Sequence, residues 1–184
     1  DSLAGPVKGA FVSTAEPHYL SLCLDRFSKF EVNSLMYQLD DRRDEQPPEA
    51  ALTMPTVKSE QLTGAVEFAA AAIGASAEWL SGYYANLIDR QELFGVWENG
   101  QLIATGESRG YDDYQTQYAD VGVIVAQLHR GNGMATKILR QLVALNEANG
   151  LTSICSTEKT NLAAQKAIER AGFFASNRII QFHS

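Results

Sequence analysis

The stretch Arg130-Gly-Asn-Gly-Met-Ala-Thr136 lies between a β-branched run, Val121-Gly-Val-Ile-Val125, and a long amphipathic segment that ends at Asn149. A strand that leads through a glycine-rich turn into a helix gathers several backbone N–H groups and the positive end of the helix dipole around one point. The two glycines permit positive φ and close approach of an anion, and the arginine adds a formal charge. The pattern therefore predicts a phosphate-binding turn.

The composition is typical of a globular protein that binds neither nucleic acid nor membranes. The 184 residues are 45% hydrophobic and 20% charged, enough for one sizeable core with an appendage. The formal net charge of −7 repels nucleic acid and suits a substrate that carries an amine. No apolar run reaches the roughly 18 to 20 residues that a membrane span needs. Because Cys23 and Cys155 are far apart in apolar surroundings, we expect a cytoplasmic protein without a disulfide framework or metal site.

Residues 1–49 predict a small N-terminal extension and a linker. Gly9 to Val12 reads as a short strand, Tyr19 to Phe27 follows a helical pattern, and Leu35 to Leu39 reads as a second strand. This segment is too small to hold its own core, so we expect it to pack on the rest of the chain. Residues 40–50 are highly charged and contain a Pro-Pro pair, which predicts the linker. We find no internal repeat in the sequence.

The remaining residues predict alternating helices and strands. A meander of three strands is indicated by Asn99-Gly100, the strongest short signal for a hairpin, because a type I′ turn needs positive φ at both positions. The expected elements, in order, are a strand at Ala51 to Met54, helices at Glu60 to Ile73 and Ala77 to Ile88 separated at Gly74, strands at Leu93 to Glu98, Gln101 to Arg109 and Tyr118 to Val125, a helix to Asn149, a strand at Thr152 to Ser156, a helix from Asn161 to Ala171, and a strand at Arg178 to Phe182.

Three kinds of phosphate site fit a glycine turn of this type to different degrees. A nucleotide P-loop requires Lys and Ser or Thr at fixed offsets, and this turn has neither. A dinucleotide fingerprint fits as Gly131-x-Gly133-x-x-Thr136, with Glu158 as the ribose partner. However, this turn follows a hairpin meander instead of opening a repeated βαβ array, and too little chain remains for a doubly wound sheet. The third kind is an acyl-CoA pyrophosphate site.

Two motifs carry a specific resemblance to a known family. Val123-x-Val125 followed by Arg130-x-x-Gly133-x-Ala135 resembles the acyl-CoA signature of the GNAT acyltransferase superfamily, and Asn161-x-x-Ala164-x-x-x-Ile168-x-x-x-Gly172-Phe173 resembles its second motif. The resemblance implies an α+β fold with a central mixed, mostly antiparallel sheet and helices on both faces. It covers residues 50–184, the expected acetyltransferase domain. Residues 1–49 fall outside it, as the remnant of a preceding half or as an added cap.

The resemblance also implies how acetyl-CoA binds. The backbone of the strand would pair with the pantetheine arm, where a local separation of strands makes room, and one N–H at its end would polarise the thioester carbonyl. The amides of the turn would take the pyrophosphate with help from Arg130, and Asn161 would bond to the arm from the opposite side. The implied cofactor-binding residues are Val123, Ile124, Val125, Arg130, Gly131, Asn132, Gly133, Met134, Ala135, Thr136 and Asn161.

The expected reaction is direct attack of an amine on the thioester. A free alkyl amine, with a pKa near ~10.4, is mostly protonated at neutral pH, so a carboxylate must help to remove a proton. Asp120 is our first candidate for this base, because it begins the strand that holds the acyl group, where the family commonly carries an acid. Glu107 on the neighbouring strand and Glu158 are the alternatives.

The chain departs from the family pattern at the position of the usual general acid. Many members carry Tyr where this sequence has Ile168, and isoleucine cannot protonate the leaving thiolate. Because a thiol has a pKa near ~8.5, the thiolate can leave without an acid, so acetyl transfer remains feasible. Ser156, Cys155 or water could replace the tyrosine.

We therefore expect a transferase that moves an acetyl group from acetyl-CoA to a small-molecule amine, with no nucleic-acid, membrane or metal partner; a homodimer stays open. The alternatives are a non-catalytic acyl-CoA-binding regulatory module, suggested by Ile168, and, less favoured, a dinucleotide-binding enzyme. Aromatic residues of the first two helices and the central loop would shape the acceptor pocket, and two acids of that loop would attract a cation. These residues are Trp79, Tyr83, Tyr84, Tyr111, Tyr114, Asp112 and Asp113.

Overall fold

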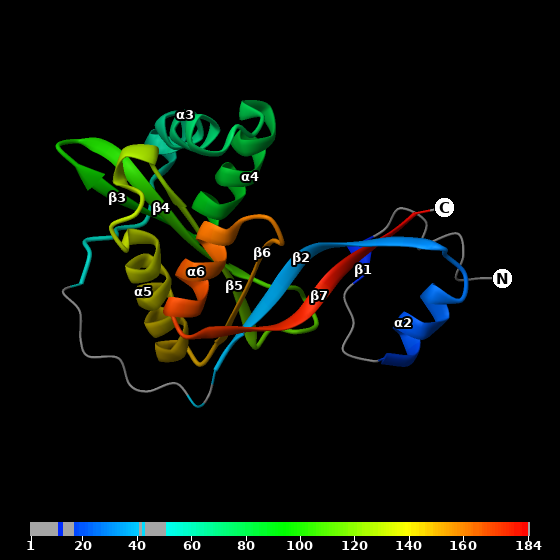
Figure 1. Cartoon of the computed structure of the whole chain (residues 1–184). Helices are drawn as coiled ribbons and strands as arrows, with labels where there is room; N and C mark the ends of the chain where they lie inside the picture. The colour runs from blue at the N-terminus through cyan, green and yellow to red at the C-terminus, as the bar shows by residue number, and fades with distance from the viewer. Residues whose placement is uncertain (1–10, 13–16, 41, 43–50, 184) are drawn as a thin grey trace.

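A seven-stranded sheet organises the chain. The computed structural model describes residues 11–12, 17–40, 42 and 51–183 (Figure 1). The elements are β1 (Phe11–Val12), α2 (Pro17–Leu24), β2 (Lys29–Leu39), η1 (Ser59–Gln61), α3 (Leu62–Ile73), α4 (Ala77–Asp89), β3 (Leu93–Glu98), β4 (Gln101–Gly110), β5 (Tyr118–Val125), η2 (Gln127–His129), α5 (Met134–Ala148), β6 (Thr152–Glu158), α6 (Leu162–Arg170) and β7 (Phe173–His183).

The strand order across the sheet is β1-β7-β2-β6-β5-β4-β3. Neighbouring strands are antiparallel except β5 and β6, which are parallel. Helices α3 and α4 pack over β3 with one buried cluster, and α5 and α6 contribute to a second cluster on the central strands. Figure 1 shows α3 and α4 on one side of the sheet and α5 and α6 on the other. The predicted α+β fold is confirmed.

Local turn chemistry explains several element boundaries. Asn99 and Gly100 both have positive φ, 51° and 78°, so the predicted hairpin between β3 and β4 is confirmed. Gly74 ends α3 in the left-handed conformation with φ of 71°, and Gly150 follows α5 with φ of 73°. The predicted hairpin and the predicted ends of α3 and α5 therefore lie at the residues that favour positive φ.

The strand predicted at Ala51 to Met54 is wrong. Both backbone groups of Leu52 bond to the Gln141 side chain, at 2.7 Å for the N–H and 3.1 Å for the carbonyl, so they are not available for a strand ladder. After this segment the chain first pairs with the sheet at Thr56, through an isolated bridge to Phe94 in β3. The predicted linker, residues 40–50, lies almost entirely outside the described residues.

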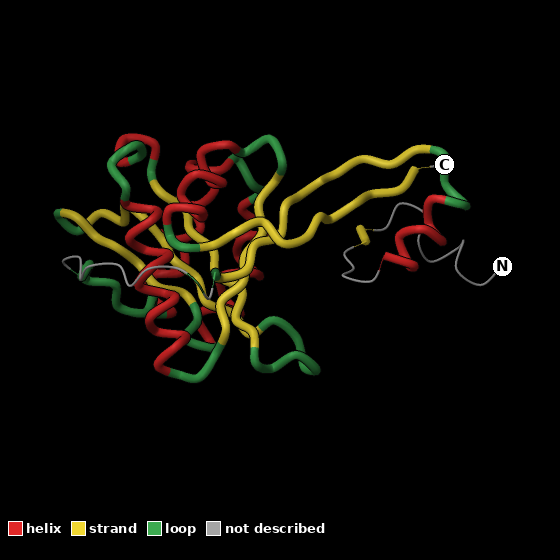
Figure 2. Tube along the Cα trace, turned by 60° about the horizontal axis from the view of Figure 1, so that its bottom comes forward, coloured by secondary structure: helices red, strands yellow, loops and turns green. Residues whose placement is uncertain are grey.

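The N-terminal segment supplies a central strand of the sheet. β2 lies between β6 and β7 and pairs with both, so this segment packs on the rest of the chain as expected. β2 and β7 are each 11 residues long, well beyond the predicted strands, because they pair with each other along most of their length. Their far ends leave the body as a ribbon that carries β1 and α2 (Figures 1 and 2).

Helix α5 packs directly on a glycine of the sheet. A Cβ at Gly106 would lie 2.8 Å from Ile138 Cγ2 and 3.2 Å from Leu142 Cδ1, and both of these side chains are fully buried. The glycine therefore sets how closely α5 approaches β4, and with it the position of the turn that precedes α5.

We expect Gly106→Ala to lower the free energy of unfolding by about 1 to 3 kcal/mol, because the added methyl overpacks the interface with α5. Urea unfolding measures this change. The matched control is Gly64→Ala in α3, where a Cβ would meet nothing within 4 Å. That substitution should leave stability unchanged or raise it by up to about 1 kcal/mol. Equal effects of the two substitutions would contradict the packing described for α5.

Candidate active site

The parallel strands β5 and β6 separate in the middle of the sheet. They pair only at Tyr118, Ala119 and Asp120, opposite residues 152–154. Beyond Asp120, β5 continues to pair with β4 up to Val125, whereas its other edge meets no strand among the described residues. The expected separation is therefore present, and it leaves a row of backbone hydrogen-bonding groups facing the gap.

A helix N-terminus stands at the end of this gap. Gly131 and Gly133 have positive φ, 83° and 77°, and Gly133 is the N-cap of α5 without a side-chain cap. The first helical bond in α5 runs from the Lys137 N–H to the Gly133 carbonyl at 3.1 Å. The amides of residues 134–136 therefore have no carbonyl within the helix to bond, and they point where an anion would sit.

Arg130 braces the turn against the rest of the fold. Its Nε donates to the carbonyl of Val125 at 2.9 Å, and its Nη2 donates to the carbonyl of Ala72, near the end of α3, at 2.8 Å. The guanidinium thus joins β5, the turn and the C-terminal end of α3. Its expected help in binding pyrophosphate stays a prediction.

Helix α6 carries the second motif. The Asn161 side chain accepts a hydrogen bond from the Ala164 N–H at 3.1 Å and caps the helix. Ile168 is buried in the core, so the position of the usual tyrosine serves packing here. Thr136 Oγ1 donates to the Ala167 carbonyl at 3.3 Å and ties the first turn of α5 to α6.

A partly buried network of polar side chains surrounds Asp120. Arg109 Nη2 donates to Asp120 Oδ2 at 2.7 Å, and Arg109 Nη1 donates to the Tyr83 hydroxyl at 2.8 Å. The Tyr83 hydroxyl in turn donates to Glu107 Oε1 at 2.9 Å. Arg109 and Asp120 are direct partners across β4 and β5, as are Glu107 and Gly122. A Cβ at Gly122 would lie 2.6 Å from Glu107 Oε1, so this glycine makes room for the carboxylate.

Burial governs the ionisation of these groups. Desolvation raises the pKa of Asp120 above its ordinary value, although the Arg109 guanidinium opposes the shift. Desolvation also raises the pKa of Glu107, again against Arg109 and the Tyr83 hydrogen bond. For Arg109 burial acts to lower the pKa, but Asp120 and Glu107 outweigh it and keep the guanidinium charged. Two carboxylates that accept protons more readily than usual therefore share one cation.

A cavity of about 240 Å³ opens beside Asp120. It is lined by Met36, Tyr111, Asp120, Ile154, Cys155, Ser156 and Ile179. The structure therefore brings together three of the five predicted catalytic candidates, Asp120, Cys155 and Ser156, whereas Glu107 and Glu158 lie outside this lining. Sequence reasoning missed Met36 and Ile179, because only the long pairing of β2 and β7 brings those residues here.

Comparison with known proteins identifies this arrangement. The family model described as "Acetyltransferase (GNAT) family" matches residues 36–173. The chain belongs to the GNAT acetyltransferase family. A second model, described as "Acetyltransferase (GNAT) domain", matches residues 4–40. Among curated protein sequences, none matches the chain.

Solved structures of GNAT proteins resemble this one. An acetyltransferase from Colwellia psychrerythraea is 55% identical with a TM-score of 0.87, and the match covers 95% of this chain and 64% of that protein. The chain thus spans less than two thirds of that relative. A GNAT protein from Novosphingobium aromaticivorans DSM 12444 is 20% identical, with a TM-score of 0.62 and coverage of 86% and 68%. AAC(6')-Ib, solved with Parmomycin and acetyl-CoA, is 17% identical, with a TM-score of 0.57 and coverage of 72% and 94%.

The aromatic residues expected around the GNAT acceptor pocket lie in four different surroundings. Tyr111 lines the cavity, whereas Tyr114 is 95% exposed. Tyr84 is a core residue near Thr105 Oγ1, and burial raises its pKa to about 12. Trp79 stacks on Tyr83, which belongs to the Asp120 network. Only Tyr111 therefore fits the expected role by position.

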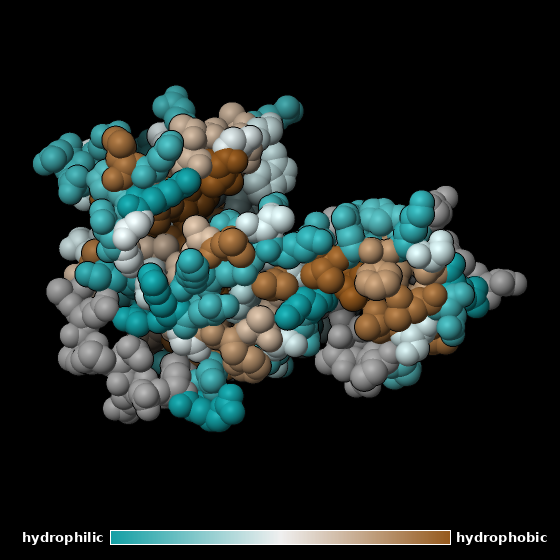
Figure 3. Space-filling view, viewed as in Figure 1, coloured by the Kyte–Doolittle hydropathy of each residue, from teal (hydrophilic) through white to brown (hydrophobic). Residues whose placement is uncertain are grey.

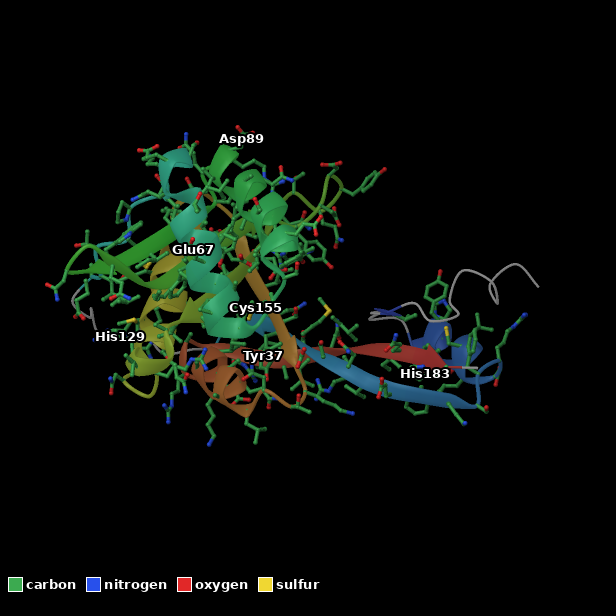
Figure 4. All side chains as sticks on the ribbon, turned by 90° about the horizontal axis from the view of Figure 1, so that it is seen from above. Tyr37, Glu67, Asp89, His129, Cys155 and His183 are labelled. Carbon is green, nitrogen blue, oxygen red and sulfur yellow. The ribbon has the colours of Figure 1, made fainter. Side chains whose placement is uncertain are left out.

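The other candidate side chains have identifiable structural roles. The Asp112 carboxylate accepts from the Tyr114 and Gln115 amides and forms the loop turn. Cys155 lies beside Tyr37 where β2 pairs with β6 (Figure 4), and burial raises the pKa of its thiol, so the thiol stays protonated. Within the described parts of the chain, no group of three or more His, Cys, Asp or Glu is placed to hold a metal ion, and no helix is long and apolar enough to span a membrane.

We expect Gly133→Ala to weaken CoA binding in this GNAT protein, because alanine at positive φ costs about 1 to 2 kcal/mol and displaces the first amides of α5. The increase in melting temperature on addition of CoA measures binding. Gly150→Ala is the matched control, since Gly150 has a similar φ of 73° at the opposite end of α5. It should lower the melting temperature and leave the CoA-induced shift intact. Loss of that shift in both variants would argue against a specific role of the turn.

Proposed function

We propose that this chain is an N-acetyltransferase that moves the acetyl group of acetyl-CoA to a small primary amine by direct attack. One observation carries the proposal: the gap between β5 and β6 opens directly after Asp120, with a helix N-terminus at one end and a cavity at the other. Donor and acceptor can therefore reach the same carboxylate from the two ends of the gap.

The donor side consists mainly of backbone groups. The unpaired edge of β5 between Val123 and Val125 suits the amide-bearing pantetheine arm, which can add to the sheet as a short strand. The amides that begin α5 suit the pyrophosphate. The space-filling view shows a hollow between the α3–α4 layer and the α5–α6 layer, where a long cosubstrate could lie (Figure 3).

The acceptor side is the cavity beside Asp120. Its volume of about 240 Å³ suits a small molecule, and its walls include Met36, Ile154 and Ile179. An amine with an apolar portion fits these walls, with its nitrogen near the carboxylate. Ser156 in the same lining can accept or donate a hydrogen bond to the substrate.

The reaction needs a proton acceptor on the amine side. The amine nitrogen attacks the thioester carbon, a C–N bond forms, and the C–S bond breaks with the electron pair going to sulfur. Asp120 accepts the amine proton, directly or through water, and the thiolate takes a proton from solvent. A backbone N–H on the free edge of β5 stabilises the transient oxyanion. Ile168 takes no part, because its side chain is buried and carries no proton.

Arg109 positions the base and limits its strength. The 2.7 Å contact orients the Asp120 carboxylate toward one geometry and favours its ionised form, against the effect of burial. The same contact lowers the basicity of the carboxylate, but burial outweighs it, so the pKa stays above its ordinary value. Glu107 is held one hydrogen bond further away through Tyr83, so we assign it to tuning of this network and retain it as the second candidate base.

We expect Asp120→Asn to lower kcat by roughly 100-fold or more, because the amide cannot accept the amine proton. Release of free thiol from acetyl-CoA with a panel of amines measures turnover. Asp89→Asn, at the exposed end of α4, is the matched control and should retain full activity. The CoA-induced thermal shift should survive in both variants. A variant at Asp120 that keeps full turnover would contradict its role, and CoA binding without turnover in the unmodified protein would favour a non-catalytic acyl-CoA module.

The pH dependence should show the ionisation of Asp120. Its pKa is raised, so the carboxylate takes up a proton at a higher pH than an ordinary aspartate, whose pKa is about 3.9. We therefore expect kcat/KM to fall as the pH drops through this raised pKa, and the acidic limb to lie above the ordinary aspartate range. Arg109→Lys removes the planar guanidinium that donates to both Asp120 and the Tyr83 hydroxyl, so it should move this limb. A limb unaffected by substitutions at both residues would assign the titration to another group.

A further inference from the structure

Two segments of the chain pair in the sheet with matching registers. At one end, Phe11 pairs with Gln181 and Val12 with Ile180. In the middle, Cys155 pairs with Tyr37 and Ser156 with Met36. Adding 144 to the numbers of Phe11 and Val12 gives 155 and 156. Subtracting 144 from the numbers of their partners gives 37 and 36, so the first set of pairs becomes the second. The same shift maps Lys29 onto Phe173 and its partner His183 onto Leu39, which also pair with each other.

The matching registers relate two β–α–β motifs, each of which inserts one strand between the two strands of the other. The first motif is β1, α2 and β2, and the second is β6, α6 and β7. β2 lies between the two strands of the second motif, and β7 lies between the two strands of the first. The sequences agree with the same shift at Leu24 and Ile168, Asp25 and Glu169, Arg26 and Arg170, Phe30 and Phe174, and Asn33 and Asn177. The chain therefore contains an internal repeat, contrary to our sequence analysis.

The two motifs differ in what covers their helices. In the second motif α5 packs on α6, Arg140 of α5 bonds to the Arg170 carbonyl at 2.7 Å, and Ile168 is only 5% exposed. Its equivalent in the first motif, Leu24, is 42% exposed. Tyr19 and Leu22 on α2 are also exposed, at 51% and 45%, but they lie on another side of the helix from Leu24, and their equivalents Ala163 and Lys166 are exposed in the second motif as well. Figure 3 shows apolar surface gathered over α2, at the far end of the ribbon that β2 and β7 form.

We propose that the first motif is the end of a second GNAT-like unit, and that the apolar face of α2 and the edge strand β1 dock the helix and parallel strand of that unit, as α5 and β5 dock on the second motif. The occupant is a further part of the same polypeptide. The GNAT domain model that matches residues 4–40 supports this, because it is distinct from the model that matches residues 36–173.

The length of the relative also supports this occupant. The Colwellia psychrerythraea protein, 55% identical, has 36% of its length beyond the match, since the chain covers 64% of it. A second copy of this chain fits less well, because its own β5 and α5 already pair and pack with its own β6 and α6. The proposal concerns assembly and holds whether or not the proposed reaction is correct.

Thiol labelling of the full-length protein, as its gene encodes it, tests the docking surface. Leu24→Cys and, as a control on another side of α2, Leu22→Cys are each made with Cys23→Ser, so that maleimide reads the new position; Cys155 is buried. Leu162→Cys, at a leucine 63% exposed at the start of α6, is the matched control. We expect Leu24→Cys to react at least roughly tenfold more slowly than Leu162→Cys, at every protein concentration, in a particle of monomer mass. Leu22→Cys should react as fast as Leu162→Cys, because its equivalent in the second motif, Lys166, is exposed.

Each other outcome overturns the proposal. A Leu24→Cys rate equal to that of Leu162→Cys would show that the face is open in the full-length protein. Protection that disappears on dilution, together with a dimer mass in light scattering, would show that a second copy covers the face. Failure of the Asp120 experiments would leave these labelling rates unchanged, so the two proposals fail separately.

Discussion

Backbone hydrogen bonding along β5 is the constraint on which the site depends. One edge of this strand is fully paired with β4, while the other pairs with β6 only as far as Asp120. Unpaired peptide groups in the interior of a sheet are costly unless water or a ligand satisfies them. A cosubstrate with amides along its length, as we propose, would satisfy them in the way that another strand would. The strands on either side thus hold the gap open: β4 pairs with β5, and β2 pairs with β6.

The polar network beside the gap has a second consequence for the fold. Two carboxylates and one guanidinium share a partly buried space, and Tyr83 links them. Breaking such a network leaves a buried charge without its partner, which costs far more than an exposed ion pair contributes. The glycine at position 122 and the cross-strand register of β4 and β5 place these groups together. Stability and chemistry are therefore linked at this point.

The sequence alone predicted the features that depend on nearby residues. Asn99-Gly100 identified the hairpin, and Gly131 and Gly133 identified the turn before α5, because positive φ is a local requirement. The family motifs predicted the fold class. The central place of β2 and the cavity residues Met36 and Ile179 were missed, since they arise from pairing between segments more than a hundred residues apart. The repeat was missed because only a few side chains preserve it, whereas the strand registers preserve it clearly.

The place of β2 also bears on how the chain folds. β6 and β7 flank one helix in the sequence, yet they do not pair with each other, because β2 lies between them. The central sheet can close only after a strand from near the start of the chain has inserted among strands from its end. Contacts between such distant segments form slowly, since the intervening chain must first give up its freedom. Until that step, β6 and β7 present open edges in the middle of the molecule, where a nascent or truncated chain is most prone to aggregate.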